Sequence, residues 1–408
     1  MPEPAMHPIA FDPTLRGPLA GLRVLDMTRL IAGNMLSLQL ADFGAEVVKV
    51  EALPHGDPLR AWGSRGVPTY WKTYCRNKKS LSVNLREQDG VDLLRRLCAG
   101  ADVLIENMIP GRLEQMGLNP EALMAENPRL VIVRISGFGQ TGPYREKPGF
   151  GTLIEAMSGF AARNGFPDRE PLVPPMALAD MMAGLSGAFA TLAALRERDA
   201  SGRGQVLDLS LLEPLVTALG AESADYAVSK QVKPRVGNGS NTSAPRNVYP
   251  TADGNWVALS ASIQSMAERV FAVVGCPELV ADPRFATNAD RVAHREEVDS
   301  IVGGWVAQRT LDEALRLFGE AGVTAGPVYD IAQFLQDEHV IEREVVVEVP
   351  DADVGGLPMQ NVNPRLSRTP GGFRYPAPAL GQHNDELLGG LGINADGLAA
   401  LRARGVIG

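Results

Sequence analysis

The sequence has 408 residues, a length that predicts two or three domains, each large enough to bury its own core. Hydrophobic residues make up 45% of the chain and charged residues 21%, which are globular averages and exclude disordered and collagen-like proteins. With 39 lysine and arginine residues against 48 aspartate and glutamate residues, the net charge is −9, so the surface as a whole repels nucleic acid and anionic lipid. An anionic ligand therefore requires a local basic pocket.

Cysteine usage and the N-terminal segment indicate a cytoplasmic protein. The three cysteines, Cys75, Cys98 and Cys276, are widely spaced and form no CxxC, which fits neither a disulfide framework nor a zinc site. Residues 1–19 lack the pattern of a signal peptide, and no uninterrupted apolar run reaches about 18 residues. We expect no export, no membrane span and, because no two histidines lie three or four residues apart, no helical metal pair.

The N-terminal third alternates apolar strands with amphipathic helices. An apolar strand over 22–28, a helix and a second strand ending at Glu51 form a βαβ unit, which requires a parallel sheet. The pattern continues with strands over 80–85, 101–107 and 130–136 and a helix over 90–97. The sequence therefore predicts an α/β domain of Rossmann-like type with at least five parallel strands and flanking helices.

Later segments predict a second, smaller α/β domain and a long tail. The expected elements are an apolar helix over 182–195, a strand near 205–211, a polar loop over 230–250, a strand over 255–261, helices over 263–274 and 291–309, and a tail with a helix, a strand, an extended run over 354–380 and a last helix from Asn384. The resulting division is a large domain over 1–225, a linker over 226–245, a small domain over 246–326 and a tail over 327–408.

Two motifs imitate a dinucleotide site. GFGQTG at 137–142 matches GxGxxG after a strand, but Pro143 and Pro148 follow where a helix would have to open, so a turn is favoured. Glu51 stands where a ribose-binding acid would stand, yet the loop before its helix has one glycine. A surface carboxylate is the simpler interpretation of Glu51.

Basic residues gather before the third strand. RNKKS at 76–80 and Arg86 form either a solvated turn, which charge runs usually are, or part of a phosphate site. Further cations lie in loops expected at the C-terminal edge of the parallel sheet, where α/β folds bind ligands: Arg60, Arg112, Arg145 and Lys147.

Asp180 lies between an apolar run and an apolar helix. Aspartate before a helix is usually an N-cap. The same position also suits catalysis, because desolvation favours the neutral acid while the helix N-terminus favours the anion, and a poorly hydrated, ionised carboxylate is a nucleophile.

The chain resembles the class III CoA-transferase family, of the formyl-CoA transferase and carnitine CoA-transferase type. The resemblance runs from about Leu19 to the C-terminus and is carried, in order, by LAGLRVLDMTRLIAGNMLSLQLADFGAEVVKVE, CRNKKSLSVNL, ADVLIENMIPGRLEQMGL, ISGFGQTGPY, ALADMMAGLSG, GRGQVLDLSLLE, YPTADGNWVAL and LGQHNDELL. It implies an interlocked, ring-like homodimer of two-domain chains, in which the tail over 327–408 returns to the large domain.

The resemblance also implies a mechanism. Asp180 in ALADMMAG would attack an acyl-CoA thioester to form an aspartyl anhydride and then an aspartyl-CoA thioester, from which CoA passes to a carboxylic acid acceptor. Coenzyme A would be a substrate, and no cofactor would be bound permanently.

Carried over by the resemblance, the expected CoA contacts are Leu30, Ile31, Ala32, Val83, Asn84, Leu85, Arg86, Asn107, Met108, Ile109 and Arg112. The chain departs from the family pattern at Ala52 and Gln115, where arginines are usual, so Arg60, Arg86 and Arg112 remain the candidates for the CoA phosphates. The glycine-rich loop that shields the intermediate in some members is matched loosely by residues 236–245.

Two alternatives stay open on the sequence. The first is an α-methylacyl-CoA racemase, but these enzymes resemble the chain with a proton-transferring histidine where Phe150 stands, and phenylalanine moves no proton. Glu155 is the nearest acid in sequence that would replace that histidine. The second is a non-catalytic subunit that binds CoA thioesters, against which the presence of Asp180 counts.

Overall fold

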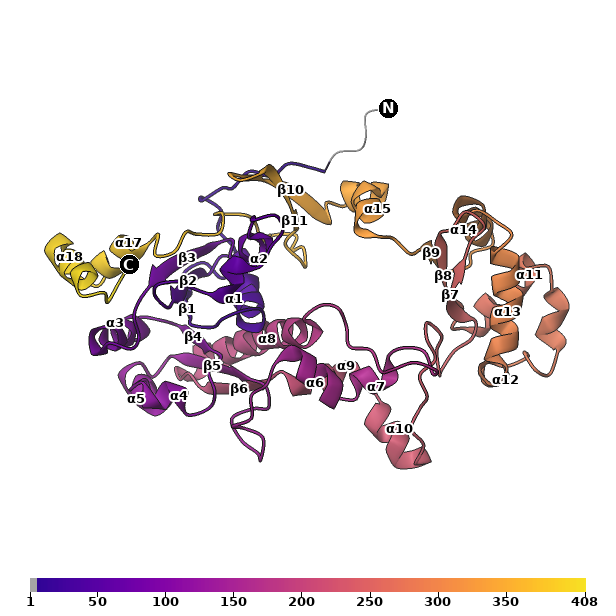
Figure 1. The fold of residues 1–408 in the computed structure, drawn as a ribbon, viewed down its shortest axis with the longest axis horizontal. Coiled ribbons are helices and arrows are strands. Elements are labelled where there is room, and N and C mark those ends of the chain that lie inside the picture. The colour runs from indigo at the N-terminus through magenta and orange to yellow at the C-terminus, as the bar shows by residue number, and fades with distance from the viewer. Residues whose placement is uncertain (1–5) are drawn as a thin grey trace. The chain divides into compact units, whose positions relative to one another are not determined.

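The computed structural model describes residues 6–408 and divides the chain into two compact units (Figure 1). We call residues 1–158, 174–220 and 336–408 the large unit, and residues 159–173 and 221–335 the small unit. The large unit therefore combines three stretches of sequence, of which the last is the C-terminal tail.

The elements that lie in the large unit are β1 Arg23–Asp26, α1 Ala32–Asp42, β2 Glu46–Glu51, η1 Pro58–Ala61, α2 Thr69–Tyr74, β3 Lys78–Ser82, α3 Gln88–Cys98, β4 Val103–Glu106, α4 Arg112–Gln115, α5 Pro120–Glu126, β5 Val131–Ser136, α6 Gly151–Met157, α8 Leu178–Ser201, β6 Val206–Ser210, α9 Leu212–Ala218, α16 Glu338–Glu342, β10 Val346–Asp351, β11 Gly355–Gln360, α17 Asn384–Gly389 and α18 Ala395–Ala403. The remaining elements are α7 Phe160–Arg163, α10 Glu222–Ser229, β7 Arg246–Pro250, β8 Trp256–Ser260, α11 Gln264–Val273, η2 Pro277–Ala281, α12 Asn288–Ala293, α13 Arg295–Val306, α14 Leu311–Glu320, β9 Ala325–Pro327 and α15 Ile331–Gln336.

A six-stranded sheet forms the centre of the large unit. Its strand order is β3-β2-β1-β4-β5-β6, and every neighbouring pair is parallel. The predicted α/β fold with a parallel sheet is confirmed, with six strands where the sequence predicts at least five. Because the order reverses between β1 and β4, this sheet has its topological switch point there, and open α/β sheets bind ligands beside such a point at the carboxyl ends of the strands.

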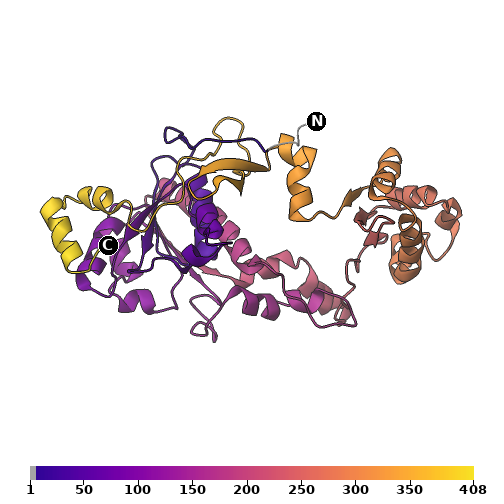
Figure 2. The same cartoon turned by 45° about the horizontal axis from the view of Figure 1, so that its top comes forward.

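The tail covers the β3 edge of the sheet (Figure 2). Asn384 at the start of α17 accepts a hydrogen bond from the Ser82 N–H at 2.9 Å, and His383 N–H donates to the Ser80 carbonyl at 3.0 Å. Side chains from α17 and α18 then join the core that α3 and the strands build, including Leu388 and Leu401. An edge strand that would otherwise expose unpaired backbone groups is thereby closed.

Helices α1 and α8 pack closely through small residues. A Cβ added to Gly184 would lie 2.7 Å from Met35 Cβ, and one added to Gly187 would lie 2.5 Å from Leu36 Cδ1. No real side chain fits at such distances, so the two glycines allow the helix axes to approach. Within the residues that the structure describes, α8 is also the one helix long and apolar enough to cross a membrane; one of its faces packs on α1, β5 and β6.

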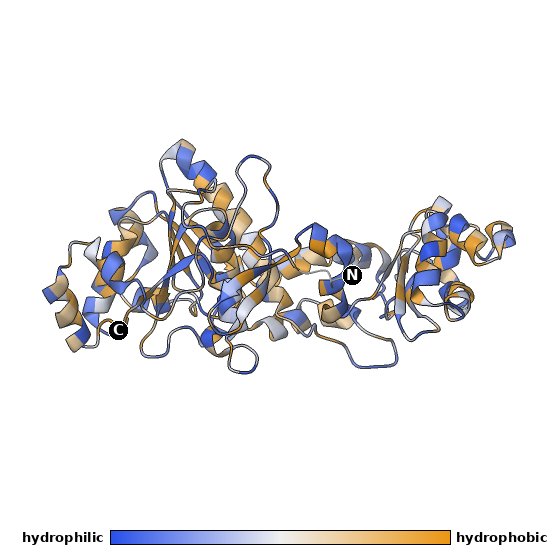
Figure 3. Cartoon of the chain, turned by 90° about the horizontal axis from the view of Figure 1, so that it is seen from above, coloured by the Kyte–Doolittle hydropathy of each residue, from blue (hydrophilic) through white to orange (hydrophobic). Residues whose placement is uncertain are grey.

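The small unit is built around the antiparallel sheet β7-β8-β9. Its helices alternate hydrophobic and hydrophilic residues along their lengths (Figure 3), and the apolar ones, among them Phe271, Val302 and Phe318, form its core.

Two expectations about irregular segments are wrong. Residues 246–250 of the expected polar loop form β7, because Tyr249 is buried against the small-unit core. Residues 355–360 of the expected extended run form β11, which pairs with β10 in an antiparallel hairpin. In both segments a partner strand supplies the hydrogen bonds that local composition does not reveal.

Candidate functional site

The loops after β1 and β4 meet at the switch point of the sheet. The Arg29 N–H donates to Asn107 Oδ1 at 3.0 Å, and Asn107 Nδ2 donates back to the Arg29 carbonyl at 2.9 Å. This reciprocal pair ties the first βα loop to the loop that follows β4. The two loops therefore form one continuous rim at the edge where α/β folds bind ligands.

The first βα loop is held in a strained backbone conformation. Leu30 has φ 63°, a left-handed conformation that non-glycine residues rarely adopt. Asp57 accepts a hydrogen bond from the Leu30 N–H at 3.0 Å, and Asn34 Nδ2 donates to the Leu30 carbonyl at 2.6 Å. Backbone strain of this kind persists only where the surroundings impose it, and it concentrates at ligand sites.

A buried charge network lies under this loop. Lys49 Nζ lies 3.2 Å from both Asp26 and Asp57 and donates to the Thr28 carbonyl, while Lys78 Nζ lies 3.4 Å from Asp26. All four side chains are almost fully buried, and their two negative and two positive charges balance. Burial alone would raise the pKa of Asp26, but the charges of Lys49 and Lys78 hold it below its usual value. The network fixes the loop to the sheet.

The cations of residues 76–80 do not form a solvated turn, because each of them pairs with a carboxylate. Arg76 is buried and donates to both carboxylate oxygens of Asp42, at 2.7 and 3.2 Å, and Lys78 belongs to the buried network. Lys79 pairs with Glu46 and Glu386. The positive charges of Arg76, Lys78 and Lys79 are therefore neutralised by carboxylates of the large unit.

Glu51 and Arg60 form an ion pair with each other. Arg60 binds the Glu51 carboxylate through two hydrogen bonds of 2.7 and 2.8 Å and stacks on the Trp71 ring at 3.7 Å. Glu51 is buried, so the interpretation of it as a surface carboxylate is wrong, and Arg60 is not free to bind a phosphate.

Two of the predicted phosphate ligands have no carboxylate partner within residues 6–408. Arg86 and Arg112 are exposed and follow β3 and β4, and Arg112 contacts only Gln115 at 3.3 Å. Arg29, which was not among the predicted ligands, is also exposed and has no ion pair with any residue of the described part of the chain, and it lies in the strained loop itself. Its place directly after the first strand was the signal available in the sequence.

The expected CoA residues all lie at the C-terminal edge of the sheet. These residues differ in exposure. Three are buried (Ile31, Ala32 and Val83), five are half-buried (Leu30, Asn84, Leu85, Asn107 and Met108), and three are exposed (Arg86, Ile109 and Arg112). Val83, Leu85 and Met108 belong to one apolar cluster. The buried members have only their backbone groups to offer a ligand.

GFGQTG forms a turn, as favoured from the prolines that follow it. Gly139 has φ 90°, Ser136 Oγ accepts a hydrogen bond from its N–H at 3.0 Å, and Asp208 accepts one from the Gln140 N–H at 3.0 Å. The next helix, α6, begins only at Gly151, so the loop itself does not open a helix as a dinucleotide fingerprint requires.

Asp180 is not the N-cap of its helix. The helix α8 begins at Leu178, and its cap position is Ala177, which makes no side-chain capping hydrogen bond. Asp180 is the third helical residue, and its carboxylate accepts a hydrogen bond from its own backbone N–H. Its carboxylate lies between the start of α8 and two other backbone segments. The Ala32 N–H at the start of α1 faces it, and a Cβ added to Gly151 would lie 2.4 Å from its Oδ2.

The environment of Asp180 favours its neutral form. Burial raises its pKa to about 6, and the negative charge of Glu155 adds to the rise, while the N–H groups of Asp180 and Ala32 act in the opposite sense. The effect of desolvation on the pKa of Asp180 is therefore larger than that of the N–H groups, although a pKa of about 6 still leaves the carboxylate mostly ionised at neutral pH. Its sequence neighbour Met181 and the nearby Ile31 belong to one apolar cluster.

Glu155 is a buried carboxylate beside the nucleophile candidate. It is 1% exposed, and its Oε1 accepts a hydrogen bond from the Ala179 N–H at 3.1 Å. Phe150, which stands where racemases place a histidine, is 67% exposed and precedes α6. Glu155 is thus held by the first turn of α8, while the position of Phe150 offers no titratable group.

The chain is similar to known CoA-transferases over nearly its whole length. The model of CoA-transferase family III matches residues 19–384. A succinyl-CoA–D-citramalate CoA-transferase from Chloroflexus aurantiacus is 43% identical over 394 residues, which cover 96% of this chain and 98% of that protein. A succinyl-CoA–L-malate CoA-transferase beta subunit from the same organism is 38% identical over 397 residues, covering 96% and 98%. A solved CAIB/BAIF family protein from Brucella suis is 33% identical, with a TM-score of 0.81 and coverage of 92% and 100%.

Proposed function

The chain belongs to CoA-transferase family III, and from that membership we propose that it moves CoA from succinyl-CoA to a dicarboxylic acid through covalent intermediates on Asp180. That it is a class III CoA-transferase acting on acyl-CoA thioesters and carboxylic acids follows from the family itself. The observation that carries the mechanistic part is the Asp180 carboxylate, raised in pKa and adjacent to the rim of the sheet.

The proposed reaction has four steps that need no external oxidant or acid. An Asp180 oxygen attacks the thioester carbonyl carbon, the C–S bond breaks, and CoA leaves as a thiolate from a mixed anhydride. The thiolate attacks the aspartyl carbonyl, which releases the donor acid and leaves an aspartyl-CoA thioester. The acceptor carboxylate then displaces the thiolate, and the thiolate attacks the acceptor acyl carbon to give the new thioester and free Asp180.

The electrostatics of Asp180 support this role. A carboxylate with a pKa of about 6 is about nine-tenths ionised at pH 7 and more basic than an ordinary aspartate. Poor solvation leaves its oxygens less shielded by water, while the Ala32 N–H directs partial positive charge at them. The N–H groups of Ala32 and Asp180, which donate to this carboxylate, can also stabilise the negative charge that develops on the aspartyl carbonyl oxygen when the thiolate attacks it.

The donor and acceptor are proposed from the relatives together with the charge of the rim. The relatives named above are named for succinyl-CoA with D-citramalate and with L-malate, both hydroxylated dicarboxylates. Arg29, exposed and without an ion pair in the described chain, is the cation nearest in sequence to Ala32 and is available for an anionic substrate group. Mass spectrometry of new thioesters, with succinyl-CoA offered against D-citramalate, L-malate, glutarate and acetate, tests the assignment. Activity with acetate alone would contradict it.

A pH profile tests the environment of Asp180. Because the carboxylate must be ionised to attack, kcat/KM is expected to fall as the pH drops below about 6. Glu155→Gln removes a nearby negative charge but keeps an acceptor for the Ala179 N–H, so the acidic limb should move to lower pH by roughly 0.5–1 unit. Glu146→Gln, at an exposed site, is the control and should leave the limb in place. A limb that stays fixed in Glu155→Gln would show that Glu155 does not tune the nucleophile.

Arg86 is proposed to bind a phosphate of CoA. Arg86→Ala should weaken CoA binding, measured by calorimetry, by about 1.5–3 kcal/mol, the loss of a charged hydrogen bond. Arg404→Ala is a matched control, since this exposed arginine of the same unit already pairs with Asp89. Dephospho-CoA shows whether the 3′-phosphate is the partner, in which case it binds wild type and Arg86→Ala alike. Unchanged CoA affinity in Arg86→Ala would show that the Arg86 side chain does not contact CoA.

We also propose that a second copy of the chain packs on the exposed face of α8. Leu185, Phe189 and Leu192 follow one another at spacings of four and three, lie on the same helix as Asp180, and are 45%, 75% and 41% exposed. An apolar stripe of this kind on a soluble protein marks an interface, and the family resemblance implies an interlocked homodimer. Light scattering should give twice the chain mass for wild type and a smaller or misassembled species for Phe189→Glu. A monodisperse, active wild-type monomer would contradict the proposal.

A further inference from the structure

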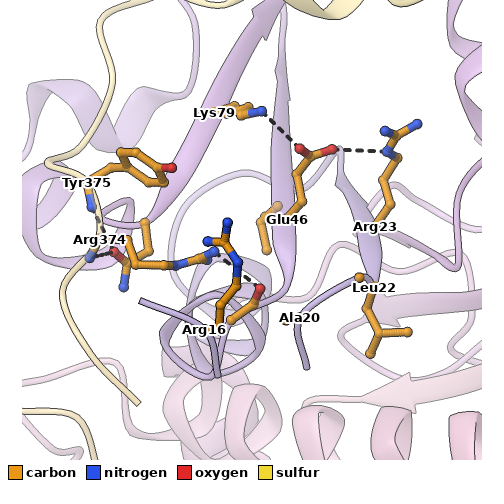
Figure 4. Close-up of a pocket in the computed structure, with 12 residues that line it drawn as sticks. Arg16, Ala20, Leu22, Arg23, Glu46, Lys79, Arg374 and Tyr375 are labelled. Carbon is orange, nitrogen blue, oxygen red and sulfur yellow. Dashed lines mark hydrogen bonds and ion pairs between the residues drawn. The ribbon is translucent and has the colours of Figure 1, made fainter. Parts of the chain in front are cut away.

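A cavity of about 370 Å³ opens on the large unit at the N-terminal ends of β1, β2 and β3 (Figure 4). Its lining includes Arg16, Arg23, Glu46, Lys79 and Arg374. None of the residues expected to bind CoA lines it, and neither does Asp180. Because parallel strands place their two ends on opposite edges of a sheet, this cavity lies at the edge remote from the candidate active site.

The charges of this cavity fall into two groups. Glu46 is shared between Arg23, whose Nε lies 3.0 Å from it, and Lys79, whose Nζ lies 2.9 Å from it (Figure 4). Arg16 and Arg374 have no carboxylate partner among residues 6–408. The cavity therefore has an excess of positive charge in a protein whose net charge is −9.

Arg374 keeps one donor unused. Its terminal nitrogens donate to the carbonyls of Ala41, Gly44 and Ala45 at 2.7–3.2 Å, where α1 ends. Its Nε is buried and has no hydrogen-bond partner in the described chain. A buried N–H without a partner costs free energy, so the site as it stands is incomplete.

Arg16 approaches Arg374 from the N-terminal segment (Figure 4). Its contacts are three carbonyls of its own turn, those of Pro13, Thr14 and Leu15, at 3.4–3.5 Å, which is the long limit for a hydrogen bond. Burial lowers the pKa of Arg374, and the positive charge of Arg16 lowers it further. Two guanidinium groups that repel each other beside a cavity are stabilised by an anion between them.

We propose that this cavity binds the phosphate group of a small organic phosphate, held between Arg16 and Arg374. A phosphate monoester carries nearly two negative charges on three oxygens, which matches two guanidinium groups that reach it from different segments. The volume exceeds what inorganic phosphate requires and lies in the range of small-molecule sites. Tyr375, which also lines the cavity, offers an aromatic surface for the organic part.

Calorimetry with glycerol 3-phosphate tests the proposal on the full-length protein saturated with CoA, so that the substrate site is already filled. Wild type should bind it saturably, and Arg16→Gln should bind at least about tenfold more weakly, because it removes the exposed cation without touching the contacts that Arg374 makes to α1. Arg95→Gln, an exposed arginine already paired with Glu126, is the control and should bind like wild type.

Two further ligands sharpen the outcome. Inorganic phosphate should compete with glycerol 3-phosphate, and succinate at the same ionic strength should not. No saturable binding to wild type, equal binding to Arg16→Gln, or succinate binding as tight as that of the phosphate would each overturn the assignment.

Discussion

Replacing Asp180 with asparagine is expected to abolish CoA transfer while the fold becomes more stable at neutral pH. Loss of a nucleophile should reduce kcat by about 10³-fold or more, since no other group of this site forms the covalent bond. The rate of thioester exchange between succinyl-CoA and an acceptor acid measures this loss. A variant that keeps wild-type activity would remove Asp180 from the mechanism.

The stability of the same variant has a defined sign. The folded-state pKa of Asp180, about 6, lies above its unfolded value, so its charge costs the folded state free energy above that pH. Asp180→Asn should therefore be more stable than wild type by about 1–3 kcal/mol at pH 7.5 in denaturant unfolding, after allowance for its partial exposure. The gain should disappear near pH 4, where the wild-type carboxyl of the folded state is neutral. A gain that does not depend on pH would show that it arises from packing.

The second large effect is expected at Asp26, in the buried network under the first βα loop. Asp26→Ala leaves Lys49 and Lys78 fully buried without the carboxylate they share, and breaking a buried pair in this way costs about 3–5 kcal/mol. Urea unfolding of the large unit measures the loss. Asp385→Ala breaks an exposed pair with Arg402 and should cost less than about 1 kcal/mol.

Asp26→Ala should also weaken CoA binding, because Lys49 holds the Thr28 carbonyl in the loop that carries Leu30. Measuring CoA affinity together with stability distinguishes this role from a purely structural one. A variant that loses stability but keeps wild-type CoA affinity would show that the buried network does not position the CoA-binding loop. Asp26→Asn keeps hydrogen-bond acceptors and is expected to lie between wild type and the alanine variant in both measurements.

Most strands of the parallel sheet were predictable because they are short apolar runs followed by a helical pattern. Hydrophobic periodicity is a local signal, and β1, β4, β5 and β6 lie within the ranges expected for them. The exception is β3, whose sequence KKSLS is largely polar and begins at Lys78, two residues before the expected range. The strands β7 and β11 were missed because their local composition is typical of loops and their pairing partners lie outside the segment. Strand formation there depends on tertiary context.

Asp180 could be singled out as a candidate nucleophile from the sequence, but its environment could not be predicted. Asp180 stands out in sequence because it lies between two apolar runs. Its pKa, however, is raised first by burial and then by the charge of Glu155, which reaches the start of α8 from 24 residues before Ala179. The basic cluster shows the same limit: Arg76 and Lys78 are neutralised by Asp42 and Asp26, more than 30 residues earlier in the chain.

Trapping the proposed covalent intermediate between Asp180 and CoA tests the mechanism most directly. The enzyme is mixed with succinyl-CoA in the absence of acceptor, treated with borohydride, digested and analysed by peptide mass spectrometry. We expect reduction of a single carboxylate, Asp180, in wild type, and no modification in Asp180→Asn, with Glu155 unmodified in both. Modification at another residue, or turnover in Asp180→Asn with no modification at all, would contradict it.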